Sequence, residues 1–164
     1  MGNYSKCPFR SPEAVSEAIQ DIIKDKIVCE LGCAEGDNMV FMSKYAKKVI
    51  GIDNNEERLS KAKERGLDVM SGDYYGVLPK ADVYYFWADK GAIDDEPLTE
   101  KIYSDPEFEG YIIVAGDTGF HTEPPAVRKC AERWNGEIRE VNFNEGSGKR
   151  ESGTFILAII RKTI

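Results

Sequence analysis

Residues 26–37 read KIVCELGCAEGD, and the predicted fold is built around this stretch. In its first half, Ile27, Val28, Cys29 and Leu31 make a short apolar run typical of a strand buried on both faces of a parallel sheet. Residues 32–36 (GCAEG) form a turn of small residues, and a helical pattern begins near Asp37 or Asn38. Glycine lets a ligand approach the main chain closely. Together these features predict a concavity at the carboxyl edge of a sheet, where open α/β sheets bind ligands.

Helical and strand patterns alternate along the rest of the chain. The helix–strand pair is predicted to repeat five times, followed by a further helix and a β-hairpin, after an irregular lead-in over residues 1–10; no range is assigned to the helix between the third and fourth strands. This order predicts a single α/β domain over residues 1–164, a Rossmann-like three-layer sandwich. Its mainly parallel seven-stranded sheet should end in an antiparallel C-terminal hairpin. Predicted helices cover residues 11–23, 38–46, 56–65, 94–103 and 123–134, and predicted strands cover residues 27–31, 49–52, 68–70, 81–87, 111–115, 138–143 and 154–160.

Net charge and cysteine content indicate which partners, metals and compartments the protein is expected to have. The formal net charge is -7, so non-specific attraction to nucleic acid or to an anionic membrane is disfavoured. The four cysteines form no C-x-x-C pair and His121 is the single histidine, which predicts reduced thiols, a cytoplasmic protein and no zinc site. No apolar run is suited to a signal peptide or long enough to span a bilayer.

Acidic residues stand at the ends of three consecutive predicted strands. Glu30 lies beside the first turn, Asp53 follows strand two and Asp73 follows strand three. In a doubly wound sheet these ends share one edge, and an acid after the second strand is placed to accept hydrogen bonds from a ribose diol. An acid after the third strand could accept one from the exocyclic amine of a base. The sequence therefore predicts a site for an adenosine-like group.

This pattern resembles the class I S-adenosylmethionine-dependent methyltransferases. The resemblance rests on E-L-G-C-A-E-G (residues 30–36), on Asp53 and Asp73, and on a βα array ending in a hairpin, and it covers nearly the whole chain. The family's first turn usually reads E/D-x-G-x-G-x-G. Glu30, Gly32 and Gly36 match this pattern, whereas Ala34 replaces the middle glycine.

The resemblance implies S-adenosyl-L-methionine as the cofactor. The turn from Gly32 through Cys33 and Ala34 to Gly36 would then pass under its methionyl part. By the same resemblance, Asp53 would hold the ribose hydroxyls, and the adenine would lie between Asn54 on one side and Asp73 with Tyr74 on the other. A nicotinamide-binding Rossmann domain is the main alternative, but its fingerprint is G-x-G-x-x-G and this turn is G-x-x-x-G.

Candidate catalytic residues come from the end of the fourth predicted strand. Asp89 could anchor a basic substrate or accept its proton, and Trp87 or Tyr85 could form a wall of the pocket. Alternatively, the aromatic residues belong to the core and Asp89 caps a loop. Neither interpretation is excluded by the sequence.

The methyl acceptor is predicted to be a nitrogen nucleophile. The chain lacks N-P-P-Y or D-P-P-Y after strand four, which argues against an adenine-N6 or glutamine methylase. Residues 7–15 (CPFRSPEAV) and 81–87 (ADVYYFW) are similar to small archaeal-type protein lysine methyltransferases. That similarity implies a protein lysine as substrate, with Tyr4 and Phe9 at its entrance, although a hydrophobic staple explains the same segment. A small-molecule O- or N-methyltransferase and a non-catalytic S-adenosylmethionine-binding subunit with a partner chain are the alternatives.

Overall fold

The computed structural model describes residues 11–88, 95–117, 126–144 and 152–164. The predicted lead-in over residues 1–10, with Tyr4 and Phe9, and the candidate catalytic residue Asp89 lie outside the described residues, as do Cys7 and His121. The described elements, in chain order, are α1 (Pro12–Ala18), α2 (Gln20–Ile23), β1 (Ile27–Leu31), α3 (Asp37–Met42), β2 (Lys48–Asp53), α4 (Glu56–Glu64), β3 (Val69–Ser71), β4 (Val83–Trp87), α5 (Asp95–Tyr103), β5 (Gly110–Asp117), α6 (Ala126–Arg133), β6 (Glu137–Asn144) and β7 (Ser152–Lys162).

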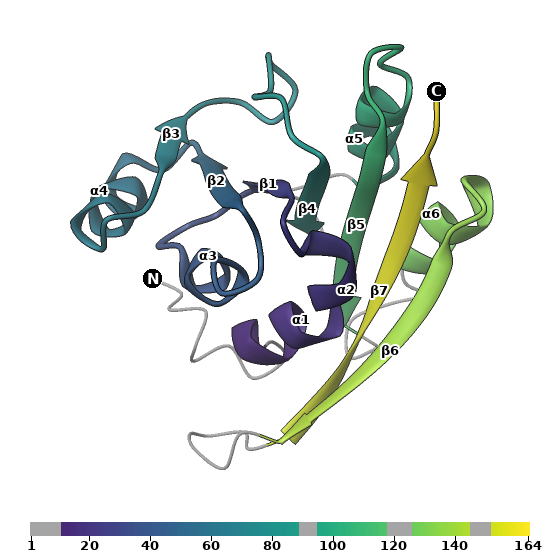
Figure 1. Cartoon of the computed structure of the whole chain (residues 1–164), viewed down its shortest axis with the longest axis horizontal. Helices are drawn as coiled ribbons and strands as arrows, with labels where there is room; N and C mark the ends of the chain where they lie inside the picture. Colours follow the sequence, from purple (N-terminus) through teal and green to yellow (C-terminus); the bar gives the residue numbers. More distant parts are fainter. Residues whose placement is uncertain (1–10, 89–94, 118–125, 145–151) are drawn as a thin grey trace.

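The described strands form one seven-stranded sheet in the order β3-β2-β1-β4-β5-β7-β6. Strands β3, β2, β1, β4 and β5 are parallel, and β7 pairs antiparallel with both β5 and β6. Strand β1 lies between β2 and β4, with Cys29 opposite Ile50 on one side and Tyr84 on the other. This arrangement confirms the predicted α/β sandwich with an antiparallel C-terminal hairpin (Figure 1).

Helices cover both faces of this sheet, and each face carries its own apolar core. On one face Val15 of α1, Met39 of α3 and Leu59 of α4 pack against the sheet. On the other face the helical contribution comes from α5 and α6, through Leu98 and Val127. Among the described helices, the first four thus pack on one face and the last two on the opposite face, so β1 and β4 at the centre are buried from both sides.

Local signals in the sequence explain where helices begin and end. Ser11 caps α1, with its Oγ accepting the Ala14 N–H at 3.1 Å, and Pro12 occupies the first helical position. Asn55 caps α4 in the same way by accepting the Arg58 N–H at 3.0 Å. Gly66 follows α4 with φ +78°, a left-handed conformation that glycine adopts without steric cost.

The structure corrects two details of the predicted order. No helix lies between β3 and β4: residues 72–82 cross from one strand to the next in turns. Asp73 folds this segment back, because its Oδ1 accepts the Tyr75 N–H at 2.9 Å, and Lys101 of α5 donates to the Tyr74 and Gly76 carbonyls. Also, α3 ends at Met42 rather than at residue 46, because the following residues turn to bridge Lys24.

The described cysteines behave as apolar core residues. Cys29, Cys33 and Cys130 are buried thiols that form no disulfide. Burial raises the pKa of Cys29 to about 12 and also raises the pKa of Cys33. Both thiols are therefore protonated near neutral pH and poorly nucleophilic. None of the described helices has the length and hydropathy needed to cross a membrane.

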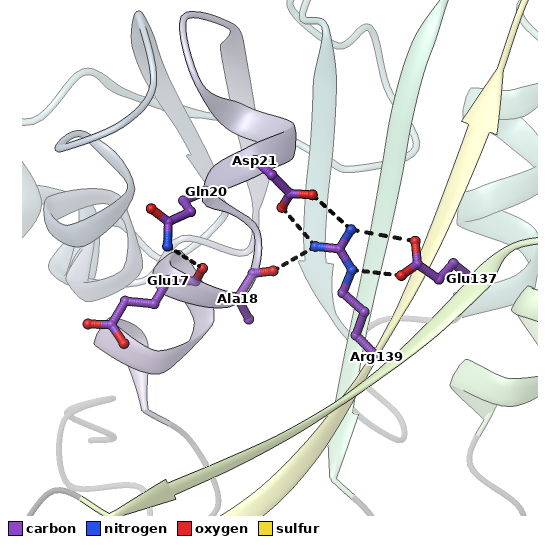
Figure 2. A network of polar contacts seen from close by, with 6 residues as sticks. All are labelled: Glu17, Ala18, Gln20, Asp21, Glu137 and Arg139. Carbon is purple, nitrogen blue, oxygen red and sulfur yellow. Dashed lines mark hydrogen bonds and ion pairs between the residues drawn. The ribbon is translucent and has the colours of Figure 1, made fainter.

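Arg139 joins the outer strand of the hairpin to the first two helices (Figure 2). Its guanidinium donates to both carboxylate oxygens of Asp21 at 2.8 and 3.0 Å, to the Ala18 carbonyl at 2.8 Å, and to Glu137 at 3.0 Å. The bonds to Asp21 connect residues that are 118 positions apart in the sequence. The hydrogen bond from Arg139 is the main reason that the pKa of Asp21 is lowered from its ordinary value.

This lowered pKa predicts a pH-dependent contribution to stability. A carboxylate with a lowered folded pKa contributes above its ordinary pKa of about 3.9, and its contribution is lost as pH falls through the folded value. We expect Asp21→Asn to reduce the free energy of unfolding by up to about 1 kcal/mol near pH 7, because the pair is partly exposed, and the difference from the parent to vanish as pH falls through the folded pKa of Asp21. Urea denaturation of both proteins at several pH values measures this difference in the free energy of unfolding.

Glu17→Gln is the matched control, because Glu17 is an exposed carboxylate of α1 next to the same network. It should leave stability unchanged at every pH. If the free energy of unfolding differed between the parent and Asp21→Asn by the same amount at every pH, the assignment of the ion pair would be contradicted.

Candidate functional site

The predicted site lies where the strand order reverses. Strand β1 leads outward to β2 and β3 on one side and to β4 and β5 on the other. The carboxyl ends of parallel strands beside such a reversal form the usual ligand crevice of open α/β sheets. Leu31, Asp53 and Trp87 end the strands that meet there. The fold therefore places the turn after β1 at the expected point of the sheet.

The turn over residues 32–36 is folded tightly against the end of β2. The N–H groups of Gly32 and Cys33 both donate to the Ile52 carbonyl, at 2.7 and 3.0 Å. Gly32 and Gly36 have φ values of +81° and +87°, and Ala34 between them has φ +49°. A left-handed alanine costs about 1 kcal/mol, so other contacts must hold this turn in place.

Asp53 supplies such a contact. Its side chain is 4% exposed, and its Oδ2 accepts the Ala34 N–H at 2.9 Å while its Oδ1 accepts the Asn55 N–H at 2.9 Å. One carboxylate thus joins the turn after β1 to the start of α4. Each carboxylate oxygen can accept more than one hydrogen bond, and binding of a ribose hydroxyl by Asp53 stays a prediction.

Glu30 is held by a residue that the sequence analysis did not identify as part of the site. The Asn38 Nδ2 donates to Glu30 Oε2 at 2.7 Å, and both side chains are buried, at 6% and 3% exposed. A buried carboxylate needs such a partner. In the sequence, Asn38 stands two residues after Gly36, at the predicted start of the helix that follows the small-residue turn.

The space between the turn and β2 is filled. A Cβ placed on Gly51 would lie 2.6 Å from the Cys33 Sγ, so only glycine fits there. Cys33 is 1% exposed. Its backbone therefore belongs to the turn, whereas its side chain packs inward against β2.

The remaining predicted cofactor residues lie around the same edge but are more open. Asp73 and Asn54 are exposed and Tyr74 is half-buried. Asp73 already accepts the Tyr75 N–H through its Oδ1. These side chains are accessible from solvent, and contact with adenine stays a prediction for each of them.

Trp87 lies at the carboxyl end of β4 and is 7% exposed. Its ring centroid is 5.9 Å from that of Phe155, which lies 5.9 Å from that of Phe143. Tyr85 is fully buried on the same face. Both aromatic residues thus contribute to the core, and a role for Trp87 as a pocket wall stays a prediction.

The glycine at position 36 gives a direct test of the turn. Gly36 and Gly66 both have positive φ, but a Cβ on Gly36 would clash with Leu67 Cδ1, whereas a Cβ on Gly66 would meet open space. Gly66→Ala should cost about 1 kcal/mol from backbone strain alone. Gly36→Ala should cost more, because the Leu67 side chain must also move to admit the methyl group. Urea denaturation measures the free energy of unfolding of both variants. Equal losses of stability would mean that the turn relaxes around the added methyl group.

Comparisons with solved structures agree with this fold. An S-adenosylmethionine-dependent methyltransferase of Thermotoga maritima, described as a possible histamine N-methyltransferase, has a TM-score of 0.67 at 18% identity, covering 93% of this chain and 89% of that one. A dimethyladenosine transferase of Plasmodium falciparum has a TM-score of 0.61 at 24% identity, covering 95% and 64%. An rRNA methylase of Streptococcus thermophilus has a TM-score of 0.61 at 15% identity, covering 96% and 100%.

No protein-family model and no curated protein sequence matches the chain. The likeness is therefore one of three-dimensional structure, at identities where it establishes the fold. The chain has the fold of the class I S-adenosylmethionine-dependent methyltransferases.

Proposed function

We propose that this protein is an S-adenosylmethionine-dependent methyltransferase that transfers a methyl group to a nitrogen nucleophile. The observation that carries the proposal is the buried Asp53 carboxylate, hydrogen-bonded to the small-residue turn at the point where the strand order reverses. This combination offers a hydroxyl-binding carboxylate beside a backbone that a ligand can approach closely.

The residues present fit this cofactor. The turn of Gly32, Cys33, Ala34 and Gly36 would lie under the methionyl part, and Asp53 would hold the ribose hydroxyls with its second lone pairs. Asp73 and Tyr74 would border the adenine, with Asn54 on its other side. Glu30 would act indirectly, because its hydrogen bond to Asn38 fixes the first turn of α3.

The bound cofactor would supply a methyl group already activated on a sulfonium. The chain then has to align the acceptor, exclude water and manage one proton. An amine must be neutral to attack, and a carboxylate or an aromatic wall near the methyl group could hold it and take up or relay its proton. We assign that role to Asp89, and we assign to Trp87 the adjoining wall at the end of β4.

A protein lysine is the preferred acceptor, ahead of a small-molecule amine. The N-terminal C-P-F-R-S-P-E-A-V segment and the net charge of -7, which suits a basic substrate, support this choice. The N-methylating activity named for the Thermotoga maritima protein also supports a nitrogen acceptor. Partner and compartment follow from the same proposal: a substrate protein, no nucleic acid, no membrane, and a cytoplasmic location.

A small-molecule O- or N-methyltransferase is the second enzymatic candidate. A non-catalytic S-adenosylmethionine-binding subunit that works with a partner chain is the third candidate. One observation favours this third candidate: the left-handed Ala34 stands where the family pattern has a glycine.

Calorimetric titration with S-adenosylmethionine and S-adenosylhomocysteine, with NAD as control, tests the cofactor. Saturable binding of the first two and none of NAD is expected. Asp53→Ala should weaken binding at least about tenfold, the equivalent of about 1.4 kcal/mol. Asp68→Ala, which removes an exposed acid paired with Lys48 before β3, is the matched control and should bind like the parent. Binding of NAD alone, or equal binding by Asp53→Ala, would refute the assignment.

Asp89→Asn separates the enzymatic candidates from the binding subunit. A radiolabelled-methyl screen on lysate proteins and metabolites first identifies the acceptor. Asp89→Asn should then reduce turnover at least about tenfold while cofactor affinity is retained, because general-base catalysis contributes about 10²–10⁴-fold. Unchanged turnover would remove Asp89 from the mechanism. A parent protein that binds S-adenosylmethionine without transferring methyl groups would leave the non-catalytic binding subunit as the remaining candidate.

A further inference from the structure

We propose that Arg65, at the end of α4, is a positioning residue that holds the cofactor turn from outside and thereby sets its affinity for S-adenosylmethionine. This inference rests on the proposed function, and it assigns a role to a side chain that would not touch the cofactor. It is based on contacts between the end of α4 and residues 35–37, which lie about thirty positions earlier in the chain.

Two bonds connect Arg65 to the turn. Its Nη1 donates to the Glu35 carbonyl at 2.9 Å and to the Asp37 Oδ1 at 2.6 Å. Both acceptors directly flank Gly36, the residue with φ +87°. One guanidinium nitrogen therefore fixes the backbone on one side of this glycine and the side chain on the other.

The carboxylate that Arg65 meets is unlike an ordinary surface acid. The Asp37 side chain is 9% exposed, whereas that of Arg65 is 39% exposed. A buried carboxylate that loses a cationic partner must either regain solvent or shift its backbone. Because Asp37 is the first residue of α3, such a shift would move the end of the turn with it.

A second cation of the same helix reaches the same turn. Lys61 Nζ lies 3.3 Å from Glu35 Oε1. Lys61 and Arg65 are four residues apart, a spacing that places both side chains on one face of a helix. Leu67, just beyond α4, fills the space next to Gly36. The end of α4 thus contacts residues 35, 36 and 37 in succession.

These contacts complement the bonds of Asp53. Asp53 holds the Ala34 N–H from the β2 side, and Arg65 holds the Glu35 carbonyl from the α4 side. Ala34 in this turn is held in a strained left-handed conformation, so each support reduces the number of conformations that the turn samples. A preorganised turn binds its ligand more tightly because less ordering is left to occur on binding.

The test compares Arg65→Met, Arg65→Lys and Lys63→Met by calorimetric titration with S-adenosylmethionine. Arg65→Met keeps most of the aliphatic stem and removes both bonds, so its Kd should rise about tenfold, the size of one charge-assisted hydrogen bond. Arg65→Lys should recover part of this loss. Lys63 is an exposed cation on the same turn of α4, and Lys63→Met should bind like the parent.

Amide hydrogen exchange of the cofactor-free proteins gives a second, independent measurement. Exchange at residues 34–40 should be faster in Arg65→Met than in the parent, with strands β5 and β7 unchanged. Faster exchange throughout the sheet would show general destabilisation instead and would overturn the positioning role.

The outcomes separate this inference from the proposed function. A parent that does not bind S-adenosylmethionine refutes the proposed function, and exchange at residues 34–40 then still decides whether Arg65 holds the turn. A parent that binds, together with Arg65→Met binding equally well, overturns the inference and leaves the proposed function intact.

Discussion

The carboxylate of Asp53 is the interaction on which the carboxyl edge of this sheet depends. It is buried at the end of β2 and accepts one backbone N–H from the turn after β1 and another from the start of α4. The turn contains a left-handed alanine between two left-handed glycines, a conformation that does not persist without support. A single side chain thereby converts three adjoining segments into one surface with defined backbone geometry.

The two faces of the sheet support this edge in different ways. Helices α1 to α4 pack on one face and bring both the turn and its α4 contacts to the same side. On the other face α5 and α6 cover the strands, and residues 72–82 cross it without a helix. Lys101 of α5 holds that crossing through the Tyr74 and Gly76 carbonyls, so the loop bearing Asp73 is also attached to the core.

Glu30, Asp37 and Asp53 are all buried near the turn, and each makes a hydrogen bond or an ion pair. Burial of several carboxylates in one place is costly unless each is matched by donors. Here the donors are backbone N–H groups, the Asn38 amide and the Arg65 guanidinium, so the acidic side chains fix the backbone around the proposed cofactor site. This explains how a turn lacking the family's middle glycine can still take a defined shape.

The sequence by itself determined the order of the strands, most of the helices, the buried character of β1 and the hairpin end, because apolar periodicity and capping residues such as Ser11 and Asn55 act over a few positions. It also placed Glu30, Asp53 and Asp73 at strand ends. It could not show that residues 72–82 lack a helix, that Trp87 packs on Phe155, or that Asn38 and Arg65 hold the turn. Only the tertiary structure decided these points. Each depends on contacts between segments that are distant in the sequence, and periodic patterns of apolar residues do not indicate which distant segments meet.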